Sequence, residues 1–138
     1  MKKVLSVLTF ILLVLTSHLC AQNIMTLSSG EGRPQDVVEI ELSITNTDDF
    51  IAFQTEIPLG ENLSYVDGSA VLHRSDDHEL VASEVNGTLK IYSYSFSSSS
   101  YSGNEGMIVS FQLKLGNEPG NVTLTNAEAK LADAAGNE

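Results

Sequence analysis

The clearest fold signal in the chain is residues 107–115, Met-Ile-Val-Ser-Phe-Gln-Leu-Lys-Leu. Apolar side chains stand at Met107 and at every second position after it, and Ser110, Gln112 and Lys114 fall between them. Successive side chains of a β-strand point to opposite faces, so a period of two predicts a strand with one face in a core and the other in water.

The same alternation occurs on both sides of this segment. It is found in Val38–Ile44, Phe53–Leu59, Leu89–Ile91 and Val122–Leu124. An amphipathic helix would instead need apolar residues three and four positions apart, and no stretch of useful length has that spacing.

Turn-forming residues separate these segments. Clusters of Gly, Asn, Asp and Pro follow each predicted strand, and Asn86-Gly87 is a strong hairpin signal because both residues tolerate positive φ. Many short strands at this spacing predict an all-β, antiparallel sandwich or barrel in a single domain.

The N-terminus predicts export. Lys2 and Lys3 precede an apolar run from Val4 to Thr16, and a polar stretch ending in Ala21 follows. This order is typical of a signal peptide over residues 1–21, and the apolar run is too short to span a bilayer comfortably. A lipid anchor on Cys20 is the weaker alternative, because the large Leu19 stands where lipoprotein signals need a small residue.

The strong negative charge of the chain argues against two classes of partner, nucleic acids and anionic membranes. Removing residues 1–21 would leave 117 residues (22–138) with 18 acidic and 5 basic side chains and no cysteine. Such a chain repels phosphate backbones and anionic membranes, so we expect neither nucleic-acid binding nor membrane insertion after signal cleavage.

Catalytic motifs are missing from the sequence. His73 and His78 flank Arg74-Ser75-Asp76-Asp77, but no HExxH, GxSxG or paired-cysteine motif accompanies them. We interpret this segment as a polar turn and the sequence from Asp133 to Glu138 as a turn, not a calcium loop. We therefore expect no enzyme activity, no metal and no cofactor.

Aromatic residues mark the candidate binding face. If Leu89 and Ile91 face the core, then Tyr92, Tyr94 and Phe96 point outward, and outward aromatic rings are used to contact proteins and sugar rings. The alternative is that these rings pack under a loop. We take Tyr92, Tyr94, Phe96 and Tyr101 as the ligand or partner face.

Several segments together resemble a cohesin domain. They are Phe50–Ile57, Asn86–Ile91, Gly106–Lys114 and Leu131–Glu138, and the resemblance runs from about Ile24 to the end. The pattern is most similar to cohesin-like modules of secreted bacterial surface proteins. There, as here, a segment like Ile57–Gly60 leads to one like Tyr65–Ser69.

The resemblance implies an antiparallel jelly-roll β-sandwich related to carbohydrate-binding modules. Cohesins bind dockerin modules and help assemble polysaccharide-degrading machinery, and their dockerin contacts lie on the sheet that corresponds to the one around Tyr92 and Tyr94. The expected function is therefore non-catalytic, extracellular binding of a dockerin-like module or of a polysaccharide. The alternative is a structural spacer in a larger cell-surface protein.

One departure concerns the C-terminus, because the sequence stops at Glu138, where cohesins form a last strand. The sequence is then either a fragment of a longer surface protein or completed at that edge by another segment. We favour the fragment.

Overall fold

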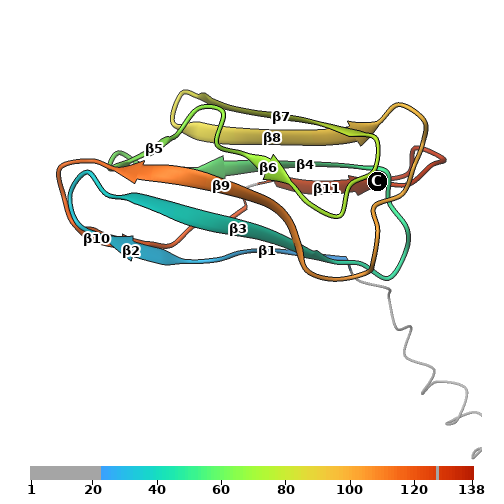
Figure 1. The fold of residues 1–138 in the computed structure, drawn as a ribbon, viewed down its shortest axis with the longest axis horizontal. Helices are drawn as coiled ribbons and strands as arrows, with labels where there is room; N and C mark the ends of the chain where they lie inside the picture. The colour runs from blue at the N-terminus through green and yellow to red at the C-terminus, as the bar shows by residue number, and fades with distance from the viewer. Residues whose placement is uncertain (1–22, 127) are drawn as a thin grey trace, which may run out of the picture.

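Two antiparallel sheets pack face to face in the computed structural model, which describes residues 23–126 and 128–138 (Figure 1). The first sheet has the order β1-β3-β9-β5, with β6 also paired to β9: β1 (Ile24–Leu27), β3 (Val37–Thr45), β9 (Met107–Leu115), β5 (Leu63–Tyr65) and β6 (Val71–Leu72). The second has the order β11-β4-β8-β7: β11 (Glu128–Ala132), β4 (Ala52–Pro58), β8 (Thr88–Ser95) and β7 (His78–Val85). A short pair, β2 (Gly30–Gly32) with β10 (Gly120–Val122), completes the set. The all-β prediction is confirmed.

The core lies between the two sheets and is filled by the residues that alternate in the sequence. Ile40, Leu42 and Ile44 of β3 are buried, as are the inward-facing residues of the other central strands: Phe53, Ile57, Leu89, Ile91, Phe111 and Leu113. The period of two therefore places these side chains correctly.

The alternation fails at one position in β9. The register between β3 and β9 shifts between Leu42 and Ser43, so that Leu42 pairs with Val109 and Ser43 with Met107. Ile108 is the extra residue of this bulge, and its side chain is also fully buried. A bulge turns one additional side chain out of the regular pleat, which a strict period of two does not anticipate.

The predicted hairpin at Asn86-Gly87 is confirmed. Val85 of β7 pairs with Thr88 of β8, so these two residues form the whole loop. Their φ angles are 52° and 73°, the left-handed values that a tight hairpin turn of this kind requires.

Arg74 ties together one end of the sandwich. Its guanidinium donates hydrogen bonds to the carbonyl oxygens of Ile44, Ser102 and Gly103 and to Oδ1 of Asn46, at 2.6–2.9 Å. The guanidinium carbon also lies 5.9 Å from the centre of the Phe50 ring. One side chain therefore fixes three loops that are far apart in the sequence.

The sandwich has an open side between β1 and β11. Among the described residues β1 pairs only with β3, and β11 pairs only with β4. Met25 and Leu131 line a groove between these two edge strands. The expectation of a last strand beyond Glu138 stays a prediction, as does the single domain over residues 22–138.

The predicted signal peptide, residues 1–21, lies outside the described residues. Within the part that the structure describes, no helix is long and apolar enough to cross a membrane.

Candidate functional site

The outer face of the β11-β4-β8-β7 sheet carries the predicted aromatic residues. The strand registers place its outward side chains in rows across all four strands, each row reading from β11 to β7. The three complete rows are Ala132–Ala52–Tyr94–Glu79, Lys130–Gln54–Tyr92–Val81 and Glu128–Glu56–Lys90–Ser83.

Three of the four predicted site residues lie on this face. Tyr92 is half-buried in the middle of the sheet, Tyr94 is 38% exposed, and Phe96, just beyond the end of β8, is 79% exposed. The rings of Tyr94 and Phe96 meet edge to face, with centroids 5.1 Å apart. These rings point outward because side chains alternate along β8, and those of Leu89 and Ile91 are buried on its other side.

Tyr101 lies elsewhere. It is only 3% exposed, and its ring packs between the sheets against Phe50, Phe53 and His78. Its hydroxyl is hydrogen-bonded to the buried Oγ of Ser93, and burial raises the pKa of Tyr101 to about 12. In this position Tyr101 belongs to the core, and its ring does not form part of the outer face.

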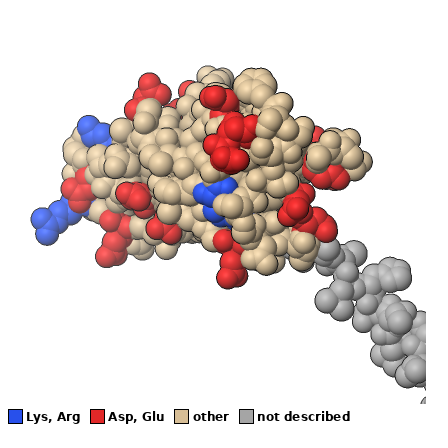
Figure 2. Space-filling view, turned by 45° about the vertical axis from the view of Figure 1, so that its right-hand side comes forward, with Lys and Arg blue, Asp and Glu red and all other residues tan. Residues whose placement is uncertain are grey.

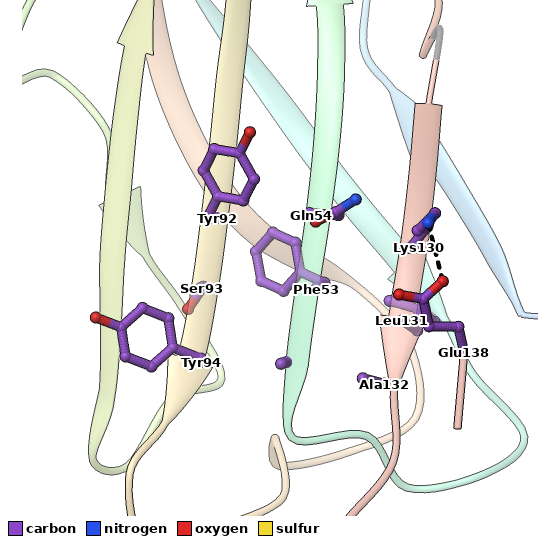
Figure 3. A pocket seen from close by; sticks show the side chains of 10 residues that line it. Phe53, Gln54, Tyr92, Ser93, Tyr94, Lys130, Leu131, Ala132 and Glu138 are labelled. Atoms are coloured by element: carbon purple, nitrogen blue, oxygen red, sulfur yellow. Dashed lines mark ion pairs between the residues drawn. The ribbon is translucent and has the colours of Figure 1, made fainter. Parts of the chain in front are cut away.

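A hollow lies toward the end of the face where β4 begins and β11 ends, and Figure 3 shows the side chains around it. Ala52 and Ala132 are too small to fill their positions in their row, so the surface dips there. Tyr92 and Tyr94 bound the hollow on the β8 side. Because the hollow is shallow and open, it accommodates one side chain of a partner better than a whole small molecule.

Lys130 and Glu138 bound the opposite side of the hollow. Their charged atoms are 2.9 Å apart, and this contact with Glu138 raises the pKa of Lys130 (Figure 3). Asp133 shapes the chain between them, since its carboxylate accepts hydrogen bonds from the backbone N–H groups of Ala135 and Asn137 and from the side-chain amide of Asn137. The predicted turn after Asp133 is confirmed.

A second ion pair borders the face next to Tyr92. Nζ of Lys90 lies 2.7 Å from Oε1 of Glu56, and the hydrogen bond to Glu56 raises the pKa of Lys90. Both basic side chains of the face, Lys90 and Lys130, therefore already have an acidic partner within the chain.

The serine-rich loop after β8 is held by Asp77. Its carboxylate accepts hydrogen bonds from the hydroxyls of Ser95 and Ser97, which lower the pKa of Asp77 to about 2. Ser99 joins the network through Ser97. Asp77 is consequently a fixed negative charge at the Phe96 end of the face.

His73 and His78 do not come together. His73 hydrogen-bonds through Nε2 to Oγ of Ser110 at 3.1 Å, on the other sheet. His78 opens β7 instead of lying in a solvated turn, and its side chain is buried against Tyr101. Within residues 23–126 and 128–138 no group of three or more His, Cys, Asp or Glu side chains is arranged to hold a metal ion.

Sequence reasoning did not identify several residues of the face. Val81 and Val85 on β7 are about half exposed, and Gln54, Lys130 and the two alanines surround the hollow. The available signal for β7 was its position directly before the Asn86-Gly87 hairpin, which requires a strand on each side. The hollow depends on which residues become neighbours across strands, and a sequence pattern does not supply that.

Several cohesin modules of known structure have this architecture. A non-cellulosomal cohesin from the archaeon Archaeoglobus fulgidus superposes with a TM-score of 0.67 and 13% identity, over 85% of this chain and 82% of the other. The chain has the cohesin fold. It is a jelly-roll β-sandwich, and the resemblance seen in the sequence is confirmed at this level.

Two other cohesins agree. A cohesin module of a family 33 glycoside hydrolase from Clostridium perfringens gives a TM-score of 0.63 at 15% identity, over 84% of this chain and 88% of the other. The sixth cohesin of Acetivibrio cellulolyticus scaffoldin B, solved in complex with a Cel5 dockerin, gives 0.62 at 14% identity, over 83% of this chain and 89% of the other. No family model and no curated protein matches the sequence.

Proposed function

We propose that this chain is a non-catalytic protein-binding module and that the outer face of the β11-β4-β8-β7 sheet receives a dockerin-type partner. The observation that carries the proposal is the gathering of exposed apolar side chains on this face. Four of the seven exposed large hydrophobic residues of the described chain lie there: Val81, Val85, Tyr94 and Phe96. Apolar patches of this kind mark interaction sites in soluble domains.

The shape of the hollow favours a protein partner over a carbohydrate with a flat binding surface. A hollow flanked by Tyr92 and Tyr94 suits a single anchoring side chain, and the Lys130–Glu138 ion pair at its border supplies a polar rim. The fold adds support, because a cohesin of the same architecture was solved with a dockerin bound. We further propose that residues 1–21 export the domain, so that binding takes place outside the cell or on its surface.

Binding to a panel of purified dockerin modules, measured by biolayer interferometry, tests the proposal. We expect at least one dockerin to bind, and Tyr92→Ala combined with Tyr94→Ala to weaken that complex by more than about 1 kcal/mol. Val81→Ser and Val37→Ser form a matched pair, since these valines are 49% and 52% exposed on opposite sheets. Only Val81→Ser should weaken binding.

Other outcomes separate the alternatives. Equal effects of Val81→Ser and Val37→Ser would show that the partner does not use this face. Binding on a glycan array that disappears with Tyr94→Ala, together with no dockerin binding, would replace the protein partner with a carbohydrate. No binding in either assay would favour the structural spacer.

A further inference from the structure

Glu79, at the aromatic end of the binding face, has no ion-pair partner among the residues that the structure describes. It is exposed, and it lies directly opposite Tyr94 in the β7–β8 register. Side chains directly opposite one another on paired strands have Cβ atoms about 4.5–5.5 Å apart. The ion pairs of the described residues occupy Lys90 and Lys130 with other acids, and none involves Glu79.

The neighbouring rings offer a surface for a flat cation. Tyr94 and Phe96 are both exposed and meet edge to face, so ring surface remains accessible on the strand position opposite Glu79. A guanidinium group is planar and weakly hydrated, stacks on aromatic faces and pairs with carboxylates through two parallel hydrogen bonds. A lysine ammonium is more strongly hydrated and lacks the flat shape.

The electrostatic field around Glu79 also favours the binding of a cation. The chain carries a net charge of −11, and one of its acidic groups, the Asp77 carboxylate, lies two residues before Glu79. Figure 2 shows acidic side chains well outnumbering basic ones on the side of the molecule in view. An approaching basic group is therefore attracted, and the basic side chains described on this face, Lys90 and Lys130, are already paired with Glu56 and Glu138.

We infer that Glu79, Tyr94 and Phe96 form a subsite for an arginine side chain of the protein partner. The inference rests on the proposed function in that it assigns the cation to that partner. The arginine would lie against the aromatic pair with its guanidinium on the Glu79 carboxylate, beside the anchoring side chain in the hollow. Selectivity would then combine an apolar contact at the hollow with a charged contact at the end of β8.

A small probe tests the subsite without a protein partner. The ¹⁵N-labelled protein is titrated by NMR with N-acetyl-arginine-N-methylamide and, separately, with the citrulline analogue, which has the same length and a neutral ureido group. We expect the arginine probe to bind at millimolar concentration and to shift the amide signals of Glu79, Tyr94 and Phe96. Glu79→Gln should weaken this binding about two- to fivefold.

Glu39 provides the internal control. It is an exposed carboxylate on the other sheet, opposite Gln112 and without an aromatic neighbour in its pair. Equal shifts at Glu39 and Glu79 would show general attraction to an acidic chain and would overturn the subsite. Equal shifts with the citrulline probe, or an unchanged affinity in Glu79→Gln, would also overturn it, because the charge would then play no part.

The two proposals fail separately. If the arginine probe binds but no dockerin does, the subsite stands and the class of partner is wrong. If a dockerin binds and the probe does not, the binding face stands and the arginine subsite is rejected.

Discussion

The ring of Tyr101 stacks on the ring of Phe50, with centroids 4.7 Å apart and planes inclined by 21°. Both residues come from loops, and their stacked rings close one end of the core. This contact explains why an aromatic residue that follows four consecutive serines is buried.

Removing the Tyr101 ring should lower the free energy of unfolding strongly. Tyr101→Ala removes the contacts with Phe50, Phe53 and His78, and we expect a loss of about 3–5 kcal/mol in the free energy of unfolding, measured with urea. Tyr101→Phe keeps the ring but leaves Oγ of Ser93 without this partner, at a cost of about 1–2 kcal/mol. A loss below 1 kcal/mol for Tyr101→Ala would contradict a core role.

The same hydroxyl predicts a dependence on alkaline pH. Burial raises the pKa of Tyr101 to about 12 in the folded protein, whereas the pKa of a tyrosine in an unfolded chain is about 10. The unfolded state therefore releases its proton first, and the stabilisation from this group, complete below about pH 10, is lost as the pH rises toward 12. The unfolding free energies of wild type and Tyr101→Phe should converge over this interval; a constant difference would contradict the assignment.

Arg74 should be irreplaceable by lysine. An ammonium group cannot reach all four of the oxygens that the guanidinium contacts, so we expect Arg74→Lys to cost about 2–3 kcal/mol in urea unfolding. Hydrogen exchange provides the local measurement. The amides of Asn46 and Tyr101, which donate to Asn104 and Phe50, should lose protection before those in the middle of β9. Uniform loss across the domain would show that Arg74 does not act on this end specifically.

Two glycines form a matched test of the hairpin. An added Cβ meets nothing within 4 Å at either Gly87 or Gly120, but only Gly87 has a positive φ, of 73°. We expect Gly87→Ala to cost about 1 kcal/mol in thermal or urea unfolding and Gly120→Ala to cost a few tenths at most. Similar costs for both would show that backbone strain is not what selects glycine in the turn.

The central strands were predictable because burial on one face imposes a period of two. Leu89 and Ile91, for example, are both fully buried, as the alternation of β8 requires. The same parity placed Tyr92, Tyr94 and Phe96 on the outer face.

The edge strands were not predictable in this way. β11 has the sequence Glu-Ala-Lys-Leu-Ala, which consists of good helix formers, and it is a strand because its backbone pairs with β4. Tyr101 was misplaced for a related reason, since a loop residue has no periodicity from which its direction can be read. The hollow between Ala52 and Ala132 arises only when two residues 80 positions apart become neighbours across strands.

Arg74 has one more consequence for a strongly acidic protein. The partners that the structure describes for its guanidinium are carbonyl and amide oxygens, none of which titrates. Acid therefore cannot neutralise them, as it neutralises the carboxylate of a salt bridge, and dissolved ions compete with them less than with an opposite charge. The hydrogen bonds of Arg74 should therefore keep these loops in place at raised salt concentration and at low pH.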